Sequence, residues 1–150
     1  MLKFAYGSNM SSAFLQRVVP SAQAVGRAEV LNYRVEFPYY SETYQGGLSG
    51  LTPAPGERTW GVLYRIADDE VAKLDRFQAG DDEGYTRKPL WVIDDSGELQ
   101  LAQAYLPTNP AGPFEPSLRY VGLMVAGAKE HGLPTQYVAR FERTLEPAKA

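Results

Sequence analysis

The sequence predicts one mixed α+β domain, residues 1–150, in which a curled sheet or small β-barrel is flanked by helices. Three observations support this prediction. A chain of 150 residues has the usual length of one compact domain, and no internal repeat, linker or shift in composition divides it. Its hydrophobic share of 44% is enough to bury a core without disulfides or a metal ion. The strand and helix patterns follow one another irregularly, which disfavours a doubly wound sheet.

The beginning of the chain predicts a strand, a glycine turn and a helix. Residues 2–6 alternate as a short strand does, and the sequence Gly7-Ser8-Asn9 ends it. Residues 10–19 carry apolar side chains at helical spacing, and Pro20 marks the end of that helix. We expect its N-cap to be one of four polar residues, Ser8, Asn9, Ser11 or Ser12.

The next forty residues predict mostly sheet. Residues 25–37 are rich in β-forming side chains and predict two strands or one bent strand. Residues 38–50 predict a polar loop that is long enough to be a functional flap. Residues 53–57, Pro-Ala-Pro-Gly-Glu, predict a turn, and residues 60–66 predict a buried strand.

A helix and a hairpin are predicted after that strand. Asp68 is expected to cap a short amphipathic helix whose apolar residues lie between 71 and 77. Residues 85–93 and 99–106 predict two strands, and the sequence Asp94-Asp95-Ser96-Gly97 predicts the turn that joins them.

The end of the chain predicts two helices after a proline-rich segment, residues 107–116. Residues 117–131 have apolar side chains at helical spacing, and Gly132 is expected just beyond the C-terminus of this helix. His131, near that end, is expected to be a surface residue that complements the helix dipole. Residues 135–145 predict a further short helix.

The composition excludes several classes of function. The net charge is −3 and the basic residues are scattered, so the chain lacks the basic face of a nucleic-acid-binding protein. The absence of cysteine excludes a thiol nucleophile and a thiolate metal site, and a single histidine excludes a two-histidine metal motif. We therefore expect an enzyme of this sequence to use carboxylates, hydroxyls and backbone amides, with no metal and no cofactor.

The location expected from the sequence is the cytoplasm. The apolar run at residues 1–6 is too short for a signal peptide, and no stretch has the length needed to span a bilayer. No membrane partner is expected.

The turn Tyr6-Gly7-Ser8-Asn9 is the first candidate for chemistry. A glycine after a strand lets the backbone approach a ligand, and free amides at a helix N-terminus favour an anion. The turn is too short for a phosphate-binding P-loop and lacks its lysine, so a substrate carboxylate is the better expectation. A simple capped turn between strand and helix explains the same residues.

Two further segments carry chemical groups. The helix end at residues 74–80 and the acidic segment that follows it, residues 81–85, could supply a desolvated carboxylate for acid–base chemistry, or form a solvated acidic turn. The segment at residues 127–134 is explained by helix packing and capping alone.

Taken in order, several segments resemble the γ-glutamylcyclotransferase family along residues 4–147. The matching segments are Phe4-Ala5-Tyr6-Gly7-Ser8-Asn9-Met10, Gly46-Gly47-Leu48, Pro55-Gly56, Trp60-Gly61-Val62-Leu63-Tyr64, Leu74-Asp75-Arg76-Phe77 with Tyr85, Tyr105-Leu106, residues 117–120 and residues 127–134.

This resemblance implies a partly closed barrel flanked by helices and a reaction without metal, cofactor or water. In the family the substrate's α-amine attacks its own γ-carbonyl, which closes 5-oxoproline and releases an amine or amino acid. The turn of residues 6–9 would hold the α-carboxylate. Three tyrosines, Tyr85, Tyr105 and Tyr120, match residues that line the family's pocket, and we expect them to position substrate.

The resemblance also identifies a departure at the catalytic position. The family's proton-transferring residue is a glutamate four positions after the leucine of its Leu-Asp motif, and this chain has Gln78 there. A neutral amide cannot serve as a general base, so the chain as written is expected to be impaired.

Three explanations for Gln78 remain open. It could be an engineered Glu-to-Gln substitution that traps substrate, or a natural residue of a non-catalytic protein that binds a γ-glutamyl or other carboxylate-bearing metabolite. Alternatively, Asp81, Asp82 or Glu83 has taken over as base. Residues 39–44 contain three tyrosines, which favours an apolar or aromatic leaving amine, although ordinary packing explains them as well. The sequence does not indicate an oligomeric state.

Overall fold

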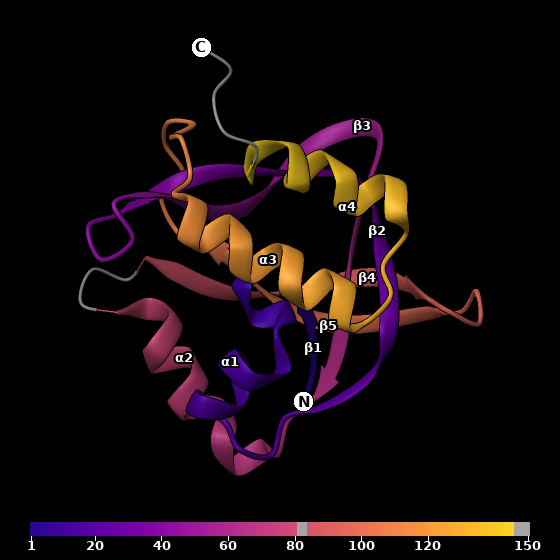
Figure 1. Cartoon of the computed structure of the whole chain (residues 1–150). Coiled ribbons are helices and arrows are strands. Elements are labelled where there is room, and N and C mark those ends of the chain that lie inside the picture. Colours follow the sequence, from indigo (N-terminus) through magenta and orange to yellow (C-terminus); the bar gives the residue numbers. More distant parts are fainter. Residues whose placement is uncertain (81–83, 146–150) are drawn as a thin grey trace.

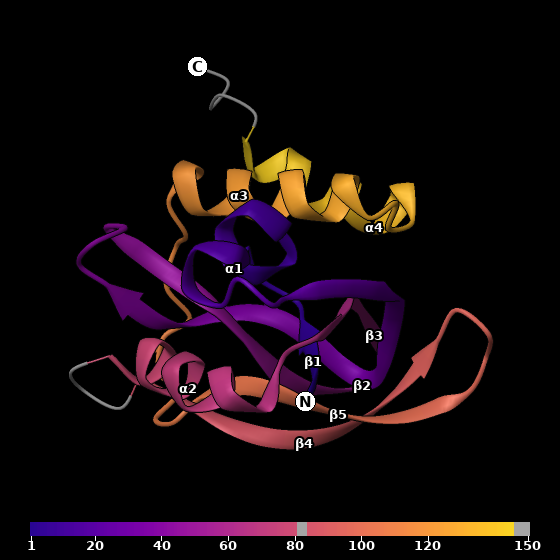
Figure 2. The same ribbon diagram turned by 90° about the horizontal axis from the view of Figure 1, so that it is seen from below.

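A closed five-stranded barrel forms the centre of the molecule, and helices cover one side of it (Figures 1 and 2). The computed structural model describes residues 1–80 and 84–145. The strands are β1 (Leu2–Ala5), β2 (Gln23–Ser41), β3 (Gly46–Arg65), β4 (Tyr85–Asp94) and β5 (Leu99–Pro107). Their order around the barrel is β1-β3-β2-β4-β5, and a parallel contact between β1 and β5 closes it. The predicted α+β class is confirmed.

Two helices connect strands, and two follow the last strand. They are α1 (Ser12–Val18), α2 (Val71–Ala79), α3 (Leu118–Glu130) and α4 (Thr135–Glu142), with 3-10 turns η1 (Ser8–Met10), η2 (Asp68–Glu70) and η3 (Arg143–Leu145). In Figure 2, α3 and α4 form a layer above the strands, with α1 between that layer and the sheet. The α2 helix lies at one end of the barrel beside β4.

The alternation of β1 divides its side chains between two hydrophobic cores. Phe4 packs inside the barrel with residues from all of the other four strands, such as Leu63 and Val92. Ala5 faces the opposite way and packs with the helices, against Met10 and Val121 among others. One short strand therefore separates the barrel interior from the helical layer.

The long β2 strand is one bent strand, as one of the two sequence predictions had it. Its pairing with β3 slips at three places, between Ala24 and Gly26, Leu31 and Tyr33, and Glu36 and Tyr39. Such irregularities bend a strand and increase its twist, which the closure of a small barrel requires.

Two expectations for the β2–β3 region are wrong. Residues 38–50 are not a flap, because Tyr39 and Tyr40 continue β2 and pair with Leu48 and Gly47 of β3. Residues 53–57 are not a turn, because β3 continues through them: Pro53 pairs with Tyr33, and residues 54–57 form a bulge opposite Asn32. There Asn32 adopts a positive φ of 67° and its side chain accepts a hydrogen bond from the Gly56 amide at 3.0 Å.

The cap of α2 is also predicted wrongly. Ala67 rather than Asp68 precedes the η2 turn, and α2 begins only at Val71. The Asp68 carboxylate lies 3.0 Å from the N-terminal ammonium of Met1, so it is engaged in an exposed ion pair.

The C-terminal helices follow the prediction. Ser117 caps α3 by accepting a hydrogen bond from the Tyr120 amide, and Gly132 follows its end with a φ of 65°. The α4 helix and η3 together occupy residues 135–145. Among the described residues, no helix is long and apolar enough to cross a membrane.

Candidate functional site

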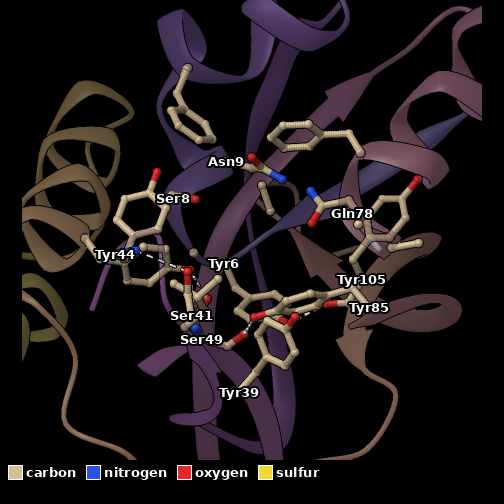
Figure 3. Close-up of a pocket in the computed structure, with 18 of the residues that line it drawn as sticks. Tyr6, Ser8, Asn9, Tyr39, Ser41, Tyr44, Ser49, Gln78, Tyr85 and Tyr105 are labelled. Carbon is tan, nitrogen blue, oxygen red and sulfur yellow. Dashed lines mark hydrogen bonds between the residues drawn. The ribbon is translucent and has the colours of Figure 1, made fainter. Parts of the chain in front are cut away.

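A cavity of about 480 Å³ opens where the turn after β1, the end of α2 and the β2–β3 hairpin meet (Figure 3). This volume is within the range of small-molecule sites. All of the sequence-predicted site residues line it: Tyr6, Gly7, Ser8, Asn9, Gln78, Tyr85, Tyr105 and Tyr120. The fold therefore brings together residues more than one hundred positions apart, while their individual roles stay predictions.

Gly7 is required at the start of the turn for steric reasons. A Cβ atom there would lie 2.2 Å from Oγ of Ser49 and 3.0 Å from the hydroxyl oxygen of Tyr120. The φ of Gly7 is −116°, which any residue adopts, so backbone strain plays no part. The glycine therefore lets the turn approach two protein hydroxyls closely, whereas the sequence prediction had a ligand in close approach to it.

The turn itself differs from the expected helix start. Its hydrogen bonds run from the Met10 amide to the Gly7 carbonyl at 3.0 Å and from the Ser11 amide to the Ser8 carbonyl at 3.1 Å. Ser11 then caps α1 by accepting from the Phe14 amide. The α-helix thus begins two residues later than predicted, because a 3-10 turn precedes it. No acceptor within residues 1–80 and 84–145 takes the amide hydrogens of Ser8 or Asn9.

Ser49 connects the two sides of the cavity, and sequence reasoning missed it. Its Oγ lies 2.7 Å from the Tyr120 hydroxyl, which also accepts a bond from the Ser49 amide at 3.2 Å. The Tyr85 hydroxyl donates to the Ser49 carbonyl at 2.6 Å. The neighbouring Gly46-Gly47-Leu48 match was the one available indication, and nothing in it identifies a serine that bonds to two distant tyrosines.

Three tyrosines of the cavity wall, Tyr6, Tyr85 and Tyr105, donate hydrogen bonds. The Tyr6 hydroxyl donates to the carbonyl oxygen of Tyr105. Burial raises the pKa of Tyr6, Tyr85 and Tyr105 above the ordinary value of a phenol, with smaller contributions from neighbouring side chains. Because these phenols keep their protons at neutral pH, they suit substrate positioning and not proton abstraction.

Asp75, one turn before Gln78 on α2, is already paired. It accepts a hydrogen bond from the Tyr105 hydroxyl at 2.6 Å and forms an ion pair with Arg87 at 3.0 Å. Burial acts to raise the pKa of the Asp75 carboxyl, but the bonds from Tyr105 and Arg87 outweigh it and hold that pKa below its usual value. Asp75 therefore fixes Tyr105 and is a poor proton acceptor. Asp81, Asp82 and Glu83 lie outside the described residues.

Gln78 faces the turn from the opposite wall. Figure 3 shows the side-chain amides of Gln78 and Asn9 pointing toward one another across the cavity. The predicted acid–base position and the predicted carboxylate-binding turn are therefore on facing walls. A substrate bound by the turn would extend toward Gln78.

His131 is not the surface residue that the sequence predicted. Its side chain is only 14% exposed, and its Nε2 lies 2.9 Å from the Tyr64 hydroxyl and 3.2 Å from Oγ of Ser12. The Tyr64 hydroxyl also donates to the Met10 carbonyl at 2.8 Å. These buried and partly buried hydrogen bonds hold η1 in place. The residues that form them are too far apart in the sequence to be recognised as a set.

Within the part of the chain that the structure describes, no three His, Cys, Asp or Glu side chains gather so that they could hold a metal ion.

Comparison with known proteins identifies the family. The model of the AIG2-like family matches residues 58–141. The γ-glutamylcyclotransferase of Mus musculus is 30% identical over 97% of this chain and 79% of its own length, and that of Homo sapiens is 29% identical over the same shares. The chain belongs to the γ-glutamylcyclotransferase family.

The solved structures agree with this family. The structure of a γ-glutamyl cyclotransferase superimposes with a TM-score of 0.91 and 28% sequence identity, covering 100% of this chain and 90% of that one. This γ-glutamylcyclotransferase-like barrel therefore has the fold of an enzyme family, and the resemblance stated from the sequence motifs is confirmed.

Proposed function

We propose that this protein cyclises a γ-glutamyl amide to 5-oxoproline and releases an amine or amino acid. One observation carries the proposal. In this member of an enzyme family, the turn of residues 6–9 and Gln78 lie on facing walls of one cavity. A cytoplasmic location and a small-molecule γ-glutamyl partner are parts of the same proposal.

The turn is proposed to hold the substrate's α-carboxylate. The free amides of Ser8 and Asn9 and their polar side chains supply donors on one side of the cavity. Anchoring the carboxylate there folds the substrate so that its α-amine can reach the γ-carbonyl, and such positioning accounts for a large share of intramolecular rate enhancement. Tyr85, Tyr105 and Tyr120 are proposed to shape the space in which this conformation is held.

The leaving amine is proposed to lie against the β2–β3 hairpin. Tyr39, Ser41, Thr43 and Tyr44 of this hairpin line the cavity. The Tyr39 ring meets Tyr85 edge-on at 5.4 Å, and the Tyr44 ring meets Tyr120 edge-on at 5.3 Å. This aromatic wall favours an apolar or aromatic amine over a charged one.

Gln78 is proposed to impair the reaction in the chain as written. General acid–base catalysis contributes typically about 10²–10⁴-fold, and a carboxamide cannot supply it. An engineered substitution, a natural loss of catalysis and a base displaced to residues 81–83 are all compatible with this position.

The test is the release of 5-oxoproline from γ-glutamyl peptides and γ-glutamylamines. The unaltered chain and Gln78→Glu are incubated with each compound, and 5-oxoproline is quantified by mass spectrometry. We expect product from Gln78→Glu at a higher rate than from the unaltered chain. No product from either protein with any compound would contradict the proposal.

A binding protein for a γ-glutamyl or other carboxylate-bearing metabolite is the second candidate. Gln78 is the specific observation that favours it, because the amide keeps the shape of a glutamate without its base function. This candidate predicts calorimetric binding of a γ-glutamyl compound by the unaltered chain and no turnover even in Gln78→Glu.

A further inference from the structure

A buried lysine lines the same cavity as Gln78. Lys3 lies in the middle of β1 and is only 2% exposed. Because side chains alternate along a strand, it shares the helical side of β1 with Ala5. Its ammonium nitrogen lies 4.5 Å from the centre of the Tyr105 ring, which stands in the cavity wall. The amine is therefore held in the protein interior, at the lining of the cavity.

Lys3 has no counter-ion among the residues of the described chain. Asp75, which accepts a hydrogen bond from the Tyr105 hydroxyl, is paired with Arg87 and forms no ion pair with Lys3. Burying a charged amine without an ion pair is costly, so such lysines release their proton readily. An apolar side chain of the same length would serve a purely structural role at a lower desolvation cost.

Lys3 is also distinctive among the groups around the cavity. Apart from it, the described lining residues are apolar residues, glycines, hydroxyl residues, tyrosines and two amides, Asn9 and Gln78. The phenols of Tyr6, Tyr85 and Tyr105 keep their protons, as argued above from the upward shifts of their pKa values. Compared with these three phenols, the Lys3 amine is the group that can change its protonation state near neutral pH.

We propose that Lys3 is the general base of this chain, which accepts a proton from the substrate's α-ammonium in place of the carboxylate that Gln78 lacks. This inference rests on the proposed cyclisation of a γ-glutamyl amide. It names the group through which the chain as written turns over its substrate, at a rate below that of Gln78→Glu.

The proposed proton transfers balance without any co-reactant. Neutral Lys3 takes one proton from the α-ammonium, and the nitrogen lone pair attacks the γ-carbonyl carbon to form the ring C–N bond. The Lys3 ammonium returns that proton to the leaving nitrogen as the original C–N bond breaks. The ring nitrogen's second proton passes to the released amine, which departs as an ammonium ion, and Lys3 is again neutral.

The electrostatic environment supports this role. Burial lowers the pKa of Lys3 from its ordinary value to about 7. A base whose pKa lies near the working pH is present in its neutral form and still accepts a proton efficiently.

The test is a double-mutant cycle of Lys3→Met and Gln78→Glu, with kcat and KM measured for 5-oxoproline release. In the Gln78 background we expect Lys3→Met to lower kcat by about 100-fold or more, with little change in KM. In the Gln78→Glu background the same change should cost less than about threefold, because the new carboxylate takes over the proton transfer. Lys88→Met, which replaces an exposed lysine on β4, is the matched control and should leave kcat and KM unchanged in both backgrounds.

The outcomes separate this inference from the proposed function. Product from Gln78→Glu alone, with none from the unaltered chain, would support the cyclisation and overturn the role of Lys3. A Lys3→Met change that raises KM equally in both backgrounds would assign Lys3 to carboxylate anchoring and overturn it as well. No product from any of the four proteins would overturn both proposals.

A direct titration keeps the inference testable even if Lys3→Met folds poorly. The ammonium signal of Lys3 can be followed by nitrogen-15 NMR in the unaltered protein and assigned by its loss in Lys3→Met. We expect Lys3 to titrate near pH 7. Titration of Lys3 near pH 10.4, the value of an unperturbed lysine, would overturn the proposal.

Discussion

The hydroxyl of Tyr120 on α3 lies 2.7 Å from Oγ of Ser49 on β3, and it also accepts a hydrogen bond from the amide of the same serine. Both residues are buried, with 4% and 3% of their surface exposed. This pair lies directly behind Gly7, so it determines how closely the turn of residues 6–9 can approach the barrel.

Tyr120→Phe should destabilise the fold through this pair. The substitution leaves the Ser49 hydroxyl and amide without a partner in a buried place, which costs about 1–3 kcal/mol. Ser49→Ala should cost about 1 kcal/mol, because it removes a single bond. Urea unfolding of both variants and of the double variant measures the coupling, and we expect the double variant to cost less than the sum. Additive costs would show that the two hydroxyls do not interact.

Gly7→Ala should be destabilising for steric reasons alone. The new Cβ would overlap Ser49 Oγ at 2.2 Å, and the required shift of strand or turn costs about 1–3 kcal/mol. Gly122→Ala on α3 is the matched control, since a Cβ atom added there would have open space within 4 Å. In a helix interior it should be neutral or stabilising by up to about 1 kcal/mol. Equal effects of the two substitutions in thermal unfolding would contradict the close approach.

Lys3→Met should change how stability depends on pH. The folded pKa of Lys3 is about 7, whereas an unfolded lysine titrates near 10.4. Between these values the unfolded chain binds the extra proton, so the unaltered protein gains stability as pH rises, by at most about 1.4 kcal/mol per unit. Lys3→Met lacks this gain, and its stability advantage should be largest at or below pH 7.

The measurement is urea unfolding of both proteins between pH 6 and pH 10. The advantage of Lys3→Met should shrink steadily above pH 7. Lys88→Met, which removes an exposed lysine, should run parallel to the unaltered protein over the same range. A constant difference between Lys3→Met and the unaltered chain would mean that Lys3 is charged throughout.

Tyr64→Phe should loosen the η1 turn, because it removes the hydroxyl that bonds to the Met10 carbonyl. The Tyr64 hydroxyl donates to the Met10 carbonyl and contacts His131 and Ser12, and the side chain is fully buried. Removing it leaves buried polar groups unpaired, at a cost of about 1–3 kcal/mol. Exchange of the hydrogen-bonded amides of Met10 and Ser11 should accelerate. Tyr40→Phe, on a half-exposed ring, is the control and should stay within about 0.5 kcal/mol of the unaltered protein.

Elements with local causes could be predicted from the sequence. The β4–β5 turn is one example, because Asp94 accepts bonds from the amides of Ser96 and Glu98 within four residues of itself. The α3 helix is another, since its cap at Ser117 and its end at Gly132 use neighbouring residues only. In both places the residues that determine the structure are adjacent in the chain.

Elements with distant partners could not be predicted in this way. Tyr39 and Tyr40 have polar, glycine-rich surroundings in the sequence, yet the barrel pairs them with β3 and extends the strand. The bulge at residues 54–57 depends on the positive φ of Asn32, more than twenty positions earlier. Local turn residues indicate an irregularity there but not whether the strand continues through it.

The residues of the candidate site also fall into two groups, those that sequence motifs mark and those that only distant contacts reveal. The turn, Gln78 and the three tyrosines were found because family motifs mark them, and all of them line the cavity. Ser49 and Lys3 were missed, because their importance depends on Tyr120, Tyr105 and burial, which only the folded chain shows. A lysine two residues from a chain start has no sequence feature that marks it as buried.

The paired β2–β3 hairpin determines how this pocket can diversify. A flexible flap would tolerate insertions and adapt its length to a new ligand, whereas a ladder from Tyr39 to Gly47 loses its register when one residue is added. Changes of ligand preference among related chains are therefore expected as exchanges of side chains at positions 39, 41, 43 and 44, with the hairpin length kept constant.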